Sequence, residues 1–433
     1  MTGVLERFAA ERGVRYFLFN FTDLRGMQRS KLVPVSAAGE MEVAGAGFAG
    51  FAAYLDMTPA NPDMFAVPDV SSVMQLPWKP EVAWVPGDLV MNGRAVEQAP
   101  RVTLKRLVER AAGLGYRMKC GVEAEFHLID ADGAGISDPR DIEAKPCYDQ
   151  QALMRRYDVI SEICDGMQSL GWSPYQNDHE DANGQFEMNW EYDDALVTAD
   201  RHAFFKFMVK SIAEMHGLRA TFMPKPFAEL TGNGCHIHVS LWDGNRNLFH
   251  DPAGELGLSA TAHAFLGGVL HHTESMCAVT NPIVNSYKRI NAPVTVSGAT
   301  WSPNTVTWSG NNRTHMVRTP DEGRFEFRLA DGAVNPYLLP AVFLAAGLDG
   351  LAQDRDPGPR LDLDMYNEGH RARRARRLPR YLLDAIRLFD RNRVLKAALG
   401  DEVSAAYVTL KMREWDDYSR SISAWERQTS LDI

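Results

Sequence analysis

Residues 121–129 read GVEAEFHLI, in which apolar and polar side chains alternate. Successive side chains of a β-strand point to opposite faces of its sheet. The alternation therefore predicts a single strand with an apolar face against the core and a polar face that carries Glu123, Glu125 and His127. A strand of this kind is typical of an antiparallel sheet with one covered face.

Three further segments repeat the alternation, and their polar positions are rich in ionisable groups. They read GQFEMNW at 184–190, GCHIHVS at 234–240 and GRFEFRL at 323–329. For any one strand, a solvated outer face is the simplest explanation. Across all four strands, however, the polar positions hold Glu, His, Arg, Asn, Gln and Ser but neither Lys nor Asp. This shared composition favours one concave site lined by several strands.

The acidic positions of these strands predict a site for divalent cations. Carboxylates gathered on one face repel one another unless cations offset their charge. Many oxygen ligands with a single nitrogen suit Mg²⁺ or Mn²⁺ better than a thiolate-bound zinc. The candidate ligands on the strands are Glu123, Glu125, Glu187, Glu326 and His236, and Glu180 in the adjoining loop NDHEDANGQFE adds a fifth glutamate.

Arginines accompany these carboxylates. Arg324 and Arg328 share the strand face of Glu326, and Arg313 and Arg318 lie in the segment NNRTHMVRTP. Guanidinium groups bind phosphate and carboxylate oxygens through two parallel hydrogen bonds. Divalent cations and arginines around one pocket indicate phosphoryl transfer, which depends mainly on positioning and charge neutralisation.

Composition excludes several other classes of protein. The chain has 433 residues, of which 45% are hydrophobic, and a net charge of −10, which argues against binding to a nucleic acid backbone. Its most apolar stretch, 338–348, is interrupted by Pro340 and Gly347 and is too short to cross a hydrocarbon core of about 30 Å. Residues 1–14 lack a signal-peptide pattern, and the five cysteines form no C-x-x-C pair. We therefore expect a cytoplasmic protein with reduced thiols and neither a membrane nor a nucleic acid partner.

The distribution of helix and strand signals divides the chain near residue 99. Residues 14–90 read as short strands and loops, whereas helical periodicity begins near Pro100. Later helices are predicted over 153–170, 203–216 and 381–399, each followed by glycine. We predict an N-terminal domain of residues 1–99 and a larger domain of residues 100–433. The arginine-rich run at 370–380 is expected to be a solvated helix start or a subunit contact rather than a nucleic-acid patch.

Several motifs together resemble the glutamine synthetase superfamily in order and approximate spacing. They read GVEAEF, NDHEDANGQFE, FMPKPF, GNGCHIHVSL, NSYKRI, NNRTHMVR, RFEFRLADGAVNPY and AAGLDG, between residues 121 and 350. The resemblance implies an α+β fold with a β-grasp N-terminal domain and a glutamine synthetase-type catalytic domain containing a funnel of antiparallel strands. It also implies a dodecamer of two stacked hexamers, with sites between neighbouring subunits.

The resemblance assigns expected roles to individual residues. One metal ion would be held by Glu125, Glu180 and Glu187, and the other by Glu123, His236 and Glu326. The remaining assignments are Arg289 and Gly232 for L-glutamate, Arg313 and Arg328 for the transferred phosphoryl group, and His238, Ser240, Arg318 and Arg324 for ATP. The implied reaction converts the γ-carboxylate of glutamate to γ-glutamyl phosphate, which an amine then attacks.

Two departures from the superfamily pattern affect the amine pocket. Ammonia-using relatives carry F-D-G-S-S in an N-terminal loop, where the aspartate helps bind and deprotonate ammonium, but residues 48–52 here read FAGFA. The relatives also carry a flap glutamate, whereas residues 290–312 contain no acidic residue and Trp301 occupies that region. Ala49, Phe51 and Trp301 thus offer apolar surface where two anions would otherwise lie.

This altered pocket is similar to that of the glutamate–methylamine ligase branch of the superfamily. Methylamine is therefore the expected amine, and Glu180 is the expected base because it remains beside the site. The alternatives are a glutamine synthetase that uses ammonia, a ligase for a larger amine, and a non-catalytic scaffold. A scaffold is disfavoured because it would have no need to keep so many carboxylates together. Tyr366 lies near the position at which some relatives carry a modified tyrosine. We expect Tyr366 to have a structural role.

Overall fold

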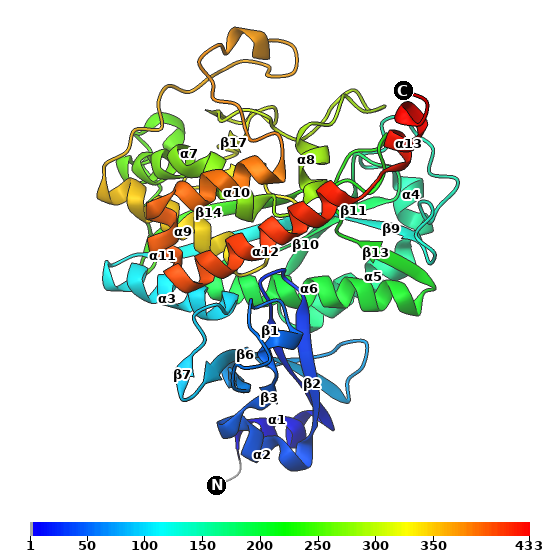
Figure 1. The fold of residues 1–433 in the computed structure, drawn as a ribbon, viewed down its shortest axis with the longest axis vertical. Coiled ribbons are helices and arrows are strands. Elements are labelled where there is room, and N and C mark those ends of the chain that lie inside the picture. The colour runs from blue at the N-terminus through cyan, green and yellow to red at the C-terminus, as the bar shows by residue number, and fades with distance from the viewer. Residues whose placement is uncertain (1–2) are drawn as a thin grey trace.

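The computed structural model describes residues 3–433, whose strands form three sheets. In Figure 1 a small sheet-rich region at the N-terminus lies below a larger region in which helices surround two further sheets. This mixed arrangement confirms the α+β class. The division near residue 99 stays a prediction.

The N-terminal sheet has the strand order β2-β1-β6-β4-β3, with β5 and β7 paired to β6. Strand β1 runs parallel to β6, which gives the mixed sheet of a β-grasp domain. Leu5 of α1 and Ala38 of α2 pack with Phe17 and Phe19 of β1 on one face of this sheet. Helix α2 was not predicted, because Gly39 lies in its middle and its apolar residues form no clear helical stripe. The elements are α1 (Val4–Arg12), β1 (Tyr16–Thr22), β2 (Gln28–Pro34), α2 (Val35–Ala44), β3 (Ala46–Phe48), β4 (Met64–Pro68), β5 (Met74–Gln75), β6 (Val82–Met91) and β7 (Arg94–Ala95).

The two sheets of the larger region are almost wholly antiparallel, and together they line the funnel implied by the resemblance. One has the order β12-β8-β14-β18-β17-β16, with β15 paired to β14, and the other has the order β10-β11-β9-β13. The strands are β8 (Arg117–Ala124), β9 (Phe126–Asp130), β10 (Pro174–His179), β11 (Gln185–Trp190), β12 (Asp193–Asp194), β13 (Leu218–Thr221), β14 (Cys235–Asp243), β15 (Arg246–Asn247), β16 (Trp308–Ser309), β17 (Val317–Arg318) and β18 (Phe325–Phe327).

The segment GVEAEFHLI passes from one sheet to the other, so the prediction of a single strand was wrong. Strand β8 ends at Ala124 and β9 begins at Phe126, with Glu125 at the crossing. The backbone N–H of Glu125 donates to the carbonyl of Gly234, and its carboxylate accepts from the Gly234 N–H. The crossing lets Glu123 and Glu125 face the same space between the sheets. His127, by contrast, is fully buried against Asn233 and lies outside that space.

Helices cover the outer faces of these sheets (Figure 1). They are α3 (Pro100–Gly113), α4 (Gln150–Arg155), α5 (Tyr157–Ser169), α6 (Ala195–Met215), α7 (Ala260–Thr280), α8 (Val284–Ile290), α9 (Leu338–Ala352), α10 (Leu382–Arg391), α11 (Arg393–Leu399), α12 (Asp401–Arg420) and α13 (Ala424–Ser430). The helices predicted over 153–170 and 381–399 are each broken in two, at Arg156 and Asn392. The arginine-rich run begins in a short 3-10 helix, Gly369–Arg371, and is otherwise irregular up to α10, so it is not the start of an α-helix. Arg376 pairs with Glu274 of α7.

The apolar stretch at 338–348 forms the first turns of α9, a core helix. Pro340 is the third helical residue, where a missing N–H leaves no intrahelical hydrogen bond unmade. Gly347 lies so close to the ring of Phe265 on α7 that a Cβ atom would approach within 2.0 Å. None of the helices in the described part of the chain has both the length and the hydrophobicity to traverse a membrane. Among residues 3–433 all five cysteines are free thiols.

Candidate active site

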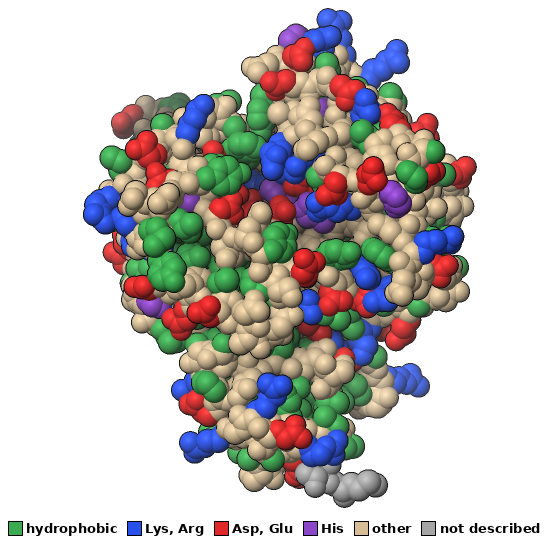
Figure 2. Space-filling model, turned by 180° about the vertical axis from the view of Figure 1, so that it is seen from behind, with side chains coloured by type: hydrophobic (Ala, Val, Ile, Leu, Met, Phe, Trp, Pro, Cys, Tyr) green, Lys and Arg blue, Asp and Glu red, His purple; other side chains and the backbone are tan. Residues whose placement is uncertain are grey.

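A cavity of about 110 Å³ lies between the two sheets of the larger region, and all six predicted metal ligands line it. The same cavity is lined by Trp301 and by the side chains of Arg313, Arg318 and Arg328. Seen from behind, the molecule is hollowed where acidic, basic and histidine side chains meet (Figure 2). The four alternating segments thus supply one shared site, as their composition predicted.

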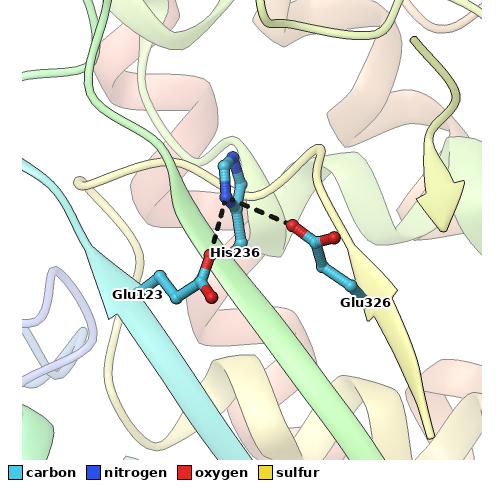
Figure 3. Close-up of side chains that lie close together, drawn as sticks. All are labelled: Glu123, His236 and Glu326. Carbon is cyan, nitrogen blue, oxygen red and sulfur yellow. Dashed lines mark hydrogen bonds and ion pairs between the residues drawn. The ribbon is translucent and has the colours of Figure 1, made fainter. Parts of the chain in front are cut away.

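The first metal-binding arrangement comes from three neighbouring strands. Glu123 of β8 and His236 of β14 are directly paired across the sheet, and Glu326 lies on the next strand, β18. His236 Nδ1 is 3.2 Å from a Glu123 carboxylate oxygen and 3.5 Å from one of Glu326 (Figure 3). One ligand atom from each of the three lies within 4.8 Å of the others. These are the three residues that the family resemblance assigns to one cation.

A second arrangement forms around Glu187 of β11. Its carboxylate groups with Glu125 and His236, and separately with Glu180 and Asp178. The predicted set of Glu125, Glu180 and Glu187 is therefore brought together, with Asp178 as an additional carboxylate. Sequence reasoning missed Asp178. It lies two positions before Glu180, so a period of two would have placed the two side chains on one face.

The donor set fits divalent cations. The Nε2 atom of His236 is buried without a hydrogen-bond partner in this structure, 3.7 Å from a Glu125 oxygen. Buried polar atoms are rarely left unpaired, so this nitrogen indicates a missing ligand. Carboxylate oxygens with one imidazole are the groups that Mg²⁺ or Mn²⁺ accepts.

Burial and mutual repulsion raise several carboxyl pKa values at the second arrangement. Burial, followed by the charge of Glu125, raises the pKa of Glu180 well above its ordinary value. Burial, followed by the charge of Glu123, does the same for the pKa of Glu187. For Asp178, burial and the charge of Glu123 raise the pKa to about 6. Without cations, this half of the site therefore holds protons.

At the first arrangement the carboxyl pKa of Glu326 is lowered instead, because cationic side chains face it. Burial alone would raise the pKa of Glu326, but Arg328 and His236 outweigh burial and lower it to about 2. Arg328 and Arg318 donate to the two Glu326 oxygens at 2.6 and 2.9 Å. Arg313, more exposed, lies at the same cavity. Arg318, which we assigned to ATP, thus lies with the residues assigned to the phosphoryl group.

The residues predicted for glutamate meet beside this cavity. Arg289 of α8 is buried, and one of its guanidinium nitrogens donates to the Leu329 carbonyl at 2.9 Å. A Cβ atom on Gly232 would lie 3.3 Å from Arg289 Cγ, and one on Gly234 would lie 3.0 Å from an Arg289 nitrogen. Glycine at these positions lets the loop approach the guanidinium closely.

A second cavity of about 460 Å³ adjoins the first and contains the other residues predicted for ATP. Glu123 lines both cavities, while His238, Ser240 and Arg324 line only the larger one, together with Tyr175, Tyr192, Trp242 and Asn247. Arg324 donates to His238 Nδ1 at 2.7 Å, and His238 Nε2 lies 2.8 Å from Glu123. An arginine can only donate, so His238 accepts at Nδ1 and donates from Nε2 to Glu123.

The predicted amine-pocket residues are divided between two places. Trp301 lines the small cavity, its backbone has a positive φ of 52°, and its N–H donates to the Tyr366 hydroxyl at 3.0 Å. The indole N–H is buried without a partner, so this ring offers a donor as well as apolar surface. Ala49 and Phe51 line neither of these two cavities in their own chain, and both are exposed. The Tyr366 contact agrees with a structural role for that residue.

Comparison with known proteins gives matches along the whole chain. The family model described as the glutamine synthetase catalytic domain matches residues 97–430. A glutamine synthetase of Rhizobium leguminosarum bv. phaseoli is 64% identical, and a glutamate–methylamine ligase of Methyloversatilis universalis is 38% identical. The first match covers 100% of both chains, and the second covers 99% of this chain and 98% of the relative.

Solved structures of GmaS are similar over 100% of both chains. A complex with ADP has a TM-score of 0.97 at 63% identity, and a form without ligand has a TM-score of 0.95 at 60% identity. Members of this family use ATP and divalent metal ions, in keeping with the two cavities and the carboxylate set. The chain belongs to the glutamine synthetase family and is an ATP-dependent glutamate–amine ligase.

Proposed function

We propose that the chain joins methylamine to the γ-carboxylate of L-glutamate, giving γ-glutamylmethylamide, ADP and phosphate. The observation that carries this proposal is the absence of acidic residues from 290–312 together with Ala49 in the N-terminal loop. Both changes remove an anion from the position where relatives receive ammonium. The glutamate–methylamine ligase at 38% identity and the similarity to GmaS support the same amine.

The residues of the cavity divide the work of the first step. Arg289 binds the α-carboxylate of glutamate, and Gly232 leaves room for its amino group. Arg313 and Arg328 face the phosphoryl group and stabilise the charge that spreads over its oxygens. The six proposed ligands would hold Mg²⁺ or Mn²⁺, which would neutralise negative charge on the phosphate oxygens of ATP. The larger cavity, with His238, Ser240 and Arg324, receives the nucleotide.

The second step needs a base and a pocket for the amine. Methylamine and ammonia are almost entirely protonated at neutral pH, so a carboxylate must take a proton before attack. Glu180 is the proposed base because it lies at the cavity beside Trp301. Trp301, with Ala49 and Phe51 supplied by a neighbouring subunit, packs against the methyl group.

Steady-state kinetics test this proposal. One methyl group in a fitted pocket contributes about 1–3 kcal/mol, so methylamine should exceed ammonium by at least about tenfold in kcat/KM. Ala49→Asp restores an anion and should narrow that difference. Ser36→Asp, on the surface of α2, is a matched control that adds the same charge away from the loop. Equal or better use of ammonium by the unmodified chain would contradict the assignment.

We also propose that twelve subunits assemble as two stacked hexamers, in which the loop around Ala49 and Phe51 completes a neighbour's site. The exposure of Phe51, at 53%, supports this arrangement. The C-terminal residues Ile422, Trp425 and Leu431 are also 66–76% exposed. Exposed apolar groups at both ends of the chain fit surfaces that a second subunit covers.

Glutamine synthesis from ammonia is the second candidate. Relatives that are 63–64% identical over the full length, from two Rhizobium species, are glutamine synthetases by name. The same kinetic comparison separates the two candidates, because only the preferred amine differs between them.

A further inference from the structure

The flap, which we define as residues 291–307, lies between α8 and β16 and carries no regular helix or strand. Trp301 brings it to the edge of the small cavity. None of its side chains is acidic. A carboxylate that binds the flap must therefore come from elsewhere in the chain.

The carboxylate of Asp181 contacts the flap. Asp181 directly follows the predicted metal ligand Glu180 and is only 7% exposed. One of its oxygens accepts from the Ser297 hydroxyl of the flap at 2.5 Å and from the Thr231 hydroxyl at 2.6 Å. Thr231 precedes Gly232, so one carboxylate joins the flap to the loop proposed to receive glutamate.

Hydroxyl groups within the flap extend this network. Thr295 Oγ1 lies 3.0 Å from Ser297 Oγ and 3.3 Å from Thr231 Oγ1, and it donates to the Ala299 carbonyl at 2.7 Å. Ser297 is buried, whereas its neighbour Val296 is 60% exposed. The flap thus turns a serine inward onto Asp181 and leaves the adjacent valine in solvent.

Asp181 depends on these hydroxyl donors. Within residues 3–433, no lysine, arginine or histidine forms an ion pair with it, and its other oxygen is 3.7 Å from the Cys147 thiol. A buried charge is unfavourable unless hydrogen bonds satisfy it, and bonds to charged acceptors are stronger than neutral ones. If Ser297 moved away, Asp181 would lose one of its two hydroxyl donors. This loss opposes opening of the flap.

We propose that Asp181 is a positioning residue that holds the flap over the γ-glutamyl phosphate and reserves this intermediate for the amine. The proposal rests on the proposed function. If the flap opens, water attacks the acyl carbon, the bond from that carbon to the phosphate oxygen breaks, and glutamate and inorganic phosphate are released. ATP is then hydrolysed without amide formation. The flap has no carboxylate of its own, and the carboxylate of Asp181, outside the flap, would thus hold it closed.

The first test compares phosphate release with amide formation in the full assembly. Ser297→Ala should raise glutamate-dependent phosphate release in the absence of amine by about tenfold, as expected for loss of a hydrogen bond to a buried charge. Asp181→Asn should act in the same direction, and Ser297→Thr, which keeps the hydroxyl, should restore coupling. Val296→Ala is the matched control on the exposed side. Unchanged coupling in Ser297→Ala would overturn the proposal.

The second test needs no turnover. Hydrogen–deuterium exchange of the flap amides in substrate-free protein should accelerate in Ser297→Ala and Asp181→Asn but not in Val296→Ala. Equal exchange rates of the flap amides in all variants would overturn the proposed role of Asp181, even if the enzyme is active. If the unmodified chain ligates no amine, the proposed function fails, while the exchange experiment still decides whether Asp181 holds the flap.

Discussion

Glu326 is fully buried and contacts both the arginines and the proposed metal ligands of the site. It accepts hydrogen bonds from two arginines and lies 3.5 Å from His236. Glu326→Ala removes a proposed metal ligand and the carboxylate that Arg318 and Arg328 share. We expect amine-dependent phosphate release to fall by about a hundredfold or more, since changes even to the groups that support ligands reduce activity or metal affinity by 10–100-fold. Exposed Glu109→Ala is the control. Near-normal activity in Glu326→Ala would show that the metal site is elsewhere.

The raised carboxyl pKa values predict proton release when metal binds. The pKa of Asp178 is about 6 in the fold against 3.8 ordinarily, so the metal-free fold holds a proton that the unfolded chain has lost. Stability of the metal-free protein should therefore decline as pH rises from about 4 to about 6. Bound Mg²⁺ should reverse this trend and displace protons, with apparent affinity rising with pH.

Calorimetry in two buffers of different ionisation enthalpy measures this release directly. The predicted result is a net release of protons near pH 6, which falls in Asp178→Asn. No buffer dependence at that pH would contradict the proposed protonation of the metal-free site.

Sequence alternation identified five of the six proposed ligands, whereas Glu180 and the acidic residues beside it lie in the adjoining loop. The run NDHED has three acidic residues in close succession. A period of two pairs Asp178 with Glu180, but nothing in the run shows which face lines the cavity. Asp178 joins Glu180 and Glu187, whereas Asp181 turns toward the flap. Asp178 lies within β10, whereas Asp181 lies beyond its end and is bound by the hydroxyl groups of the distant residues Thr231 and Ser297.

At the scale of elements, alternation predicted the strands that line the site, but it did not predict the break between β8 and β9 at Glu125. Both sides of Glu125 keep the same alternation, so nothing local marks the change of sheet. The helix breaks at Arg156 and Asn392 also have distant causes. Arg156 donates to the Ser137 hydroxyl at 2.9 Å, and Asn392 contacts His272 while capping α11. Contacts of this kind override local helical propensity.

Arg101 of α3 ties the N-terminal sheet to the helices of the larger region. Its buried guanidinium donates to Asp69 after β4, Asp88 of β6 and Asp200 of α6 at 2.6–3.0 Å. Arg101→Met leaves the buried Asp200 carboxylate without its cation, while Lys105 still pairs with Asp88. Removing one partner of a buried ionic cluster costs about 3–5 kcal/mol. Chemical denaturation measures the loss, with exposed Arg110→Met on the same helix as control. A change below about 1 kcal/mol would mean that this cluster does not join the two regions.

At the scale of the whole molecule, the proposed shared site predicts complementation between inactive subunits. Glu326→Ala damages the cavity, and Phe51→Asp damages the loop proposed to reach the neighbour's cavity. Each variant alone should have little activity, but co-expressed chains should form hybrid assemblies in which some sites are intact. Activity recovered only on co-expression supports the shared site. Full activity of Phe51→Asp, or of a monomer isolated by sedimentation, would contradict it.

The central claim is the amine, and direct competition tests it in one reaction. Equal concentrations of ammonium and methylamine are supplied with L-glutamate, ATP and Mg²⁺, and the two amide products are quantified by mass spectrometry. The product ratio equals the ratio of the two kcat/KM values, so γ-glutamylmethylamide should exceed glutamine by at least about tenfold. Glutamine in equal or greater amount would contradict the account and identify the chain as a glutamine synthetase in activity as well as in family.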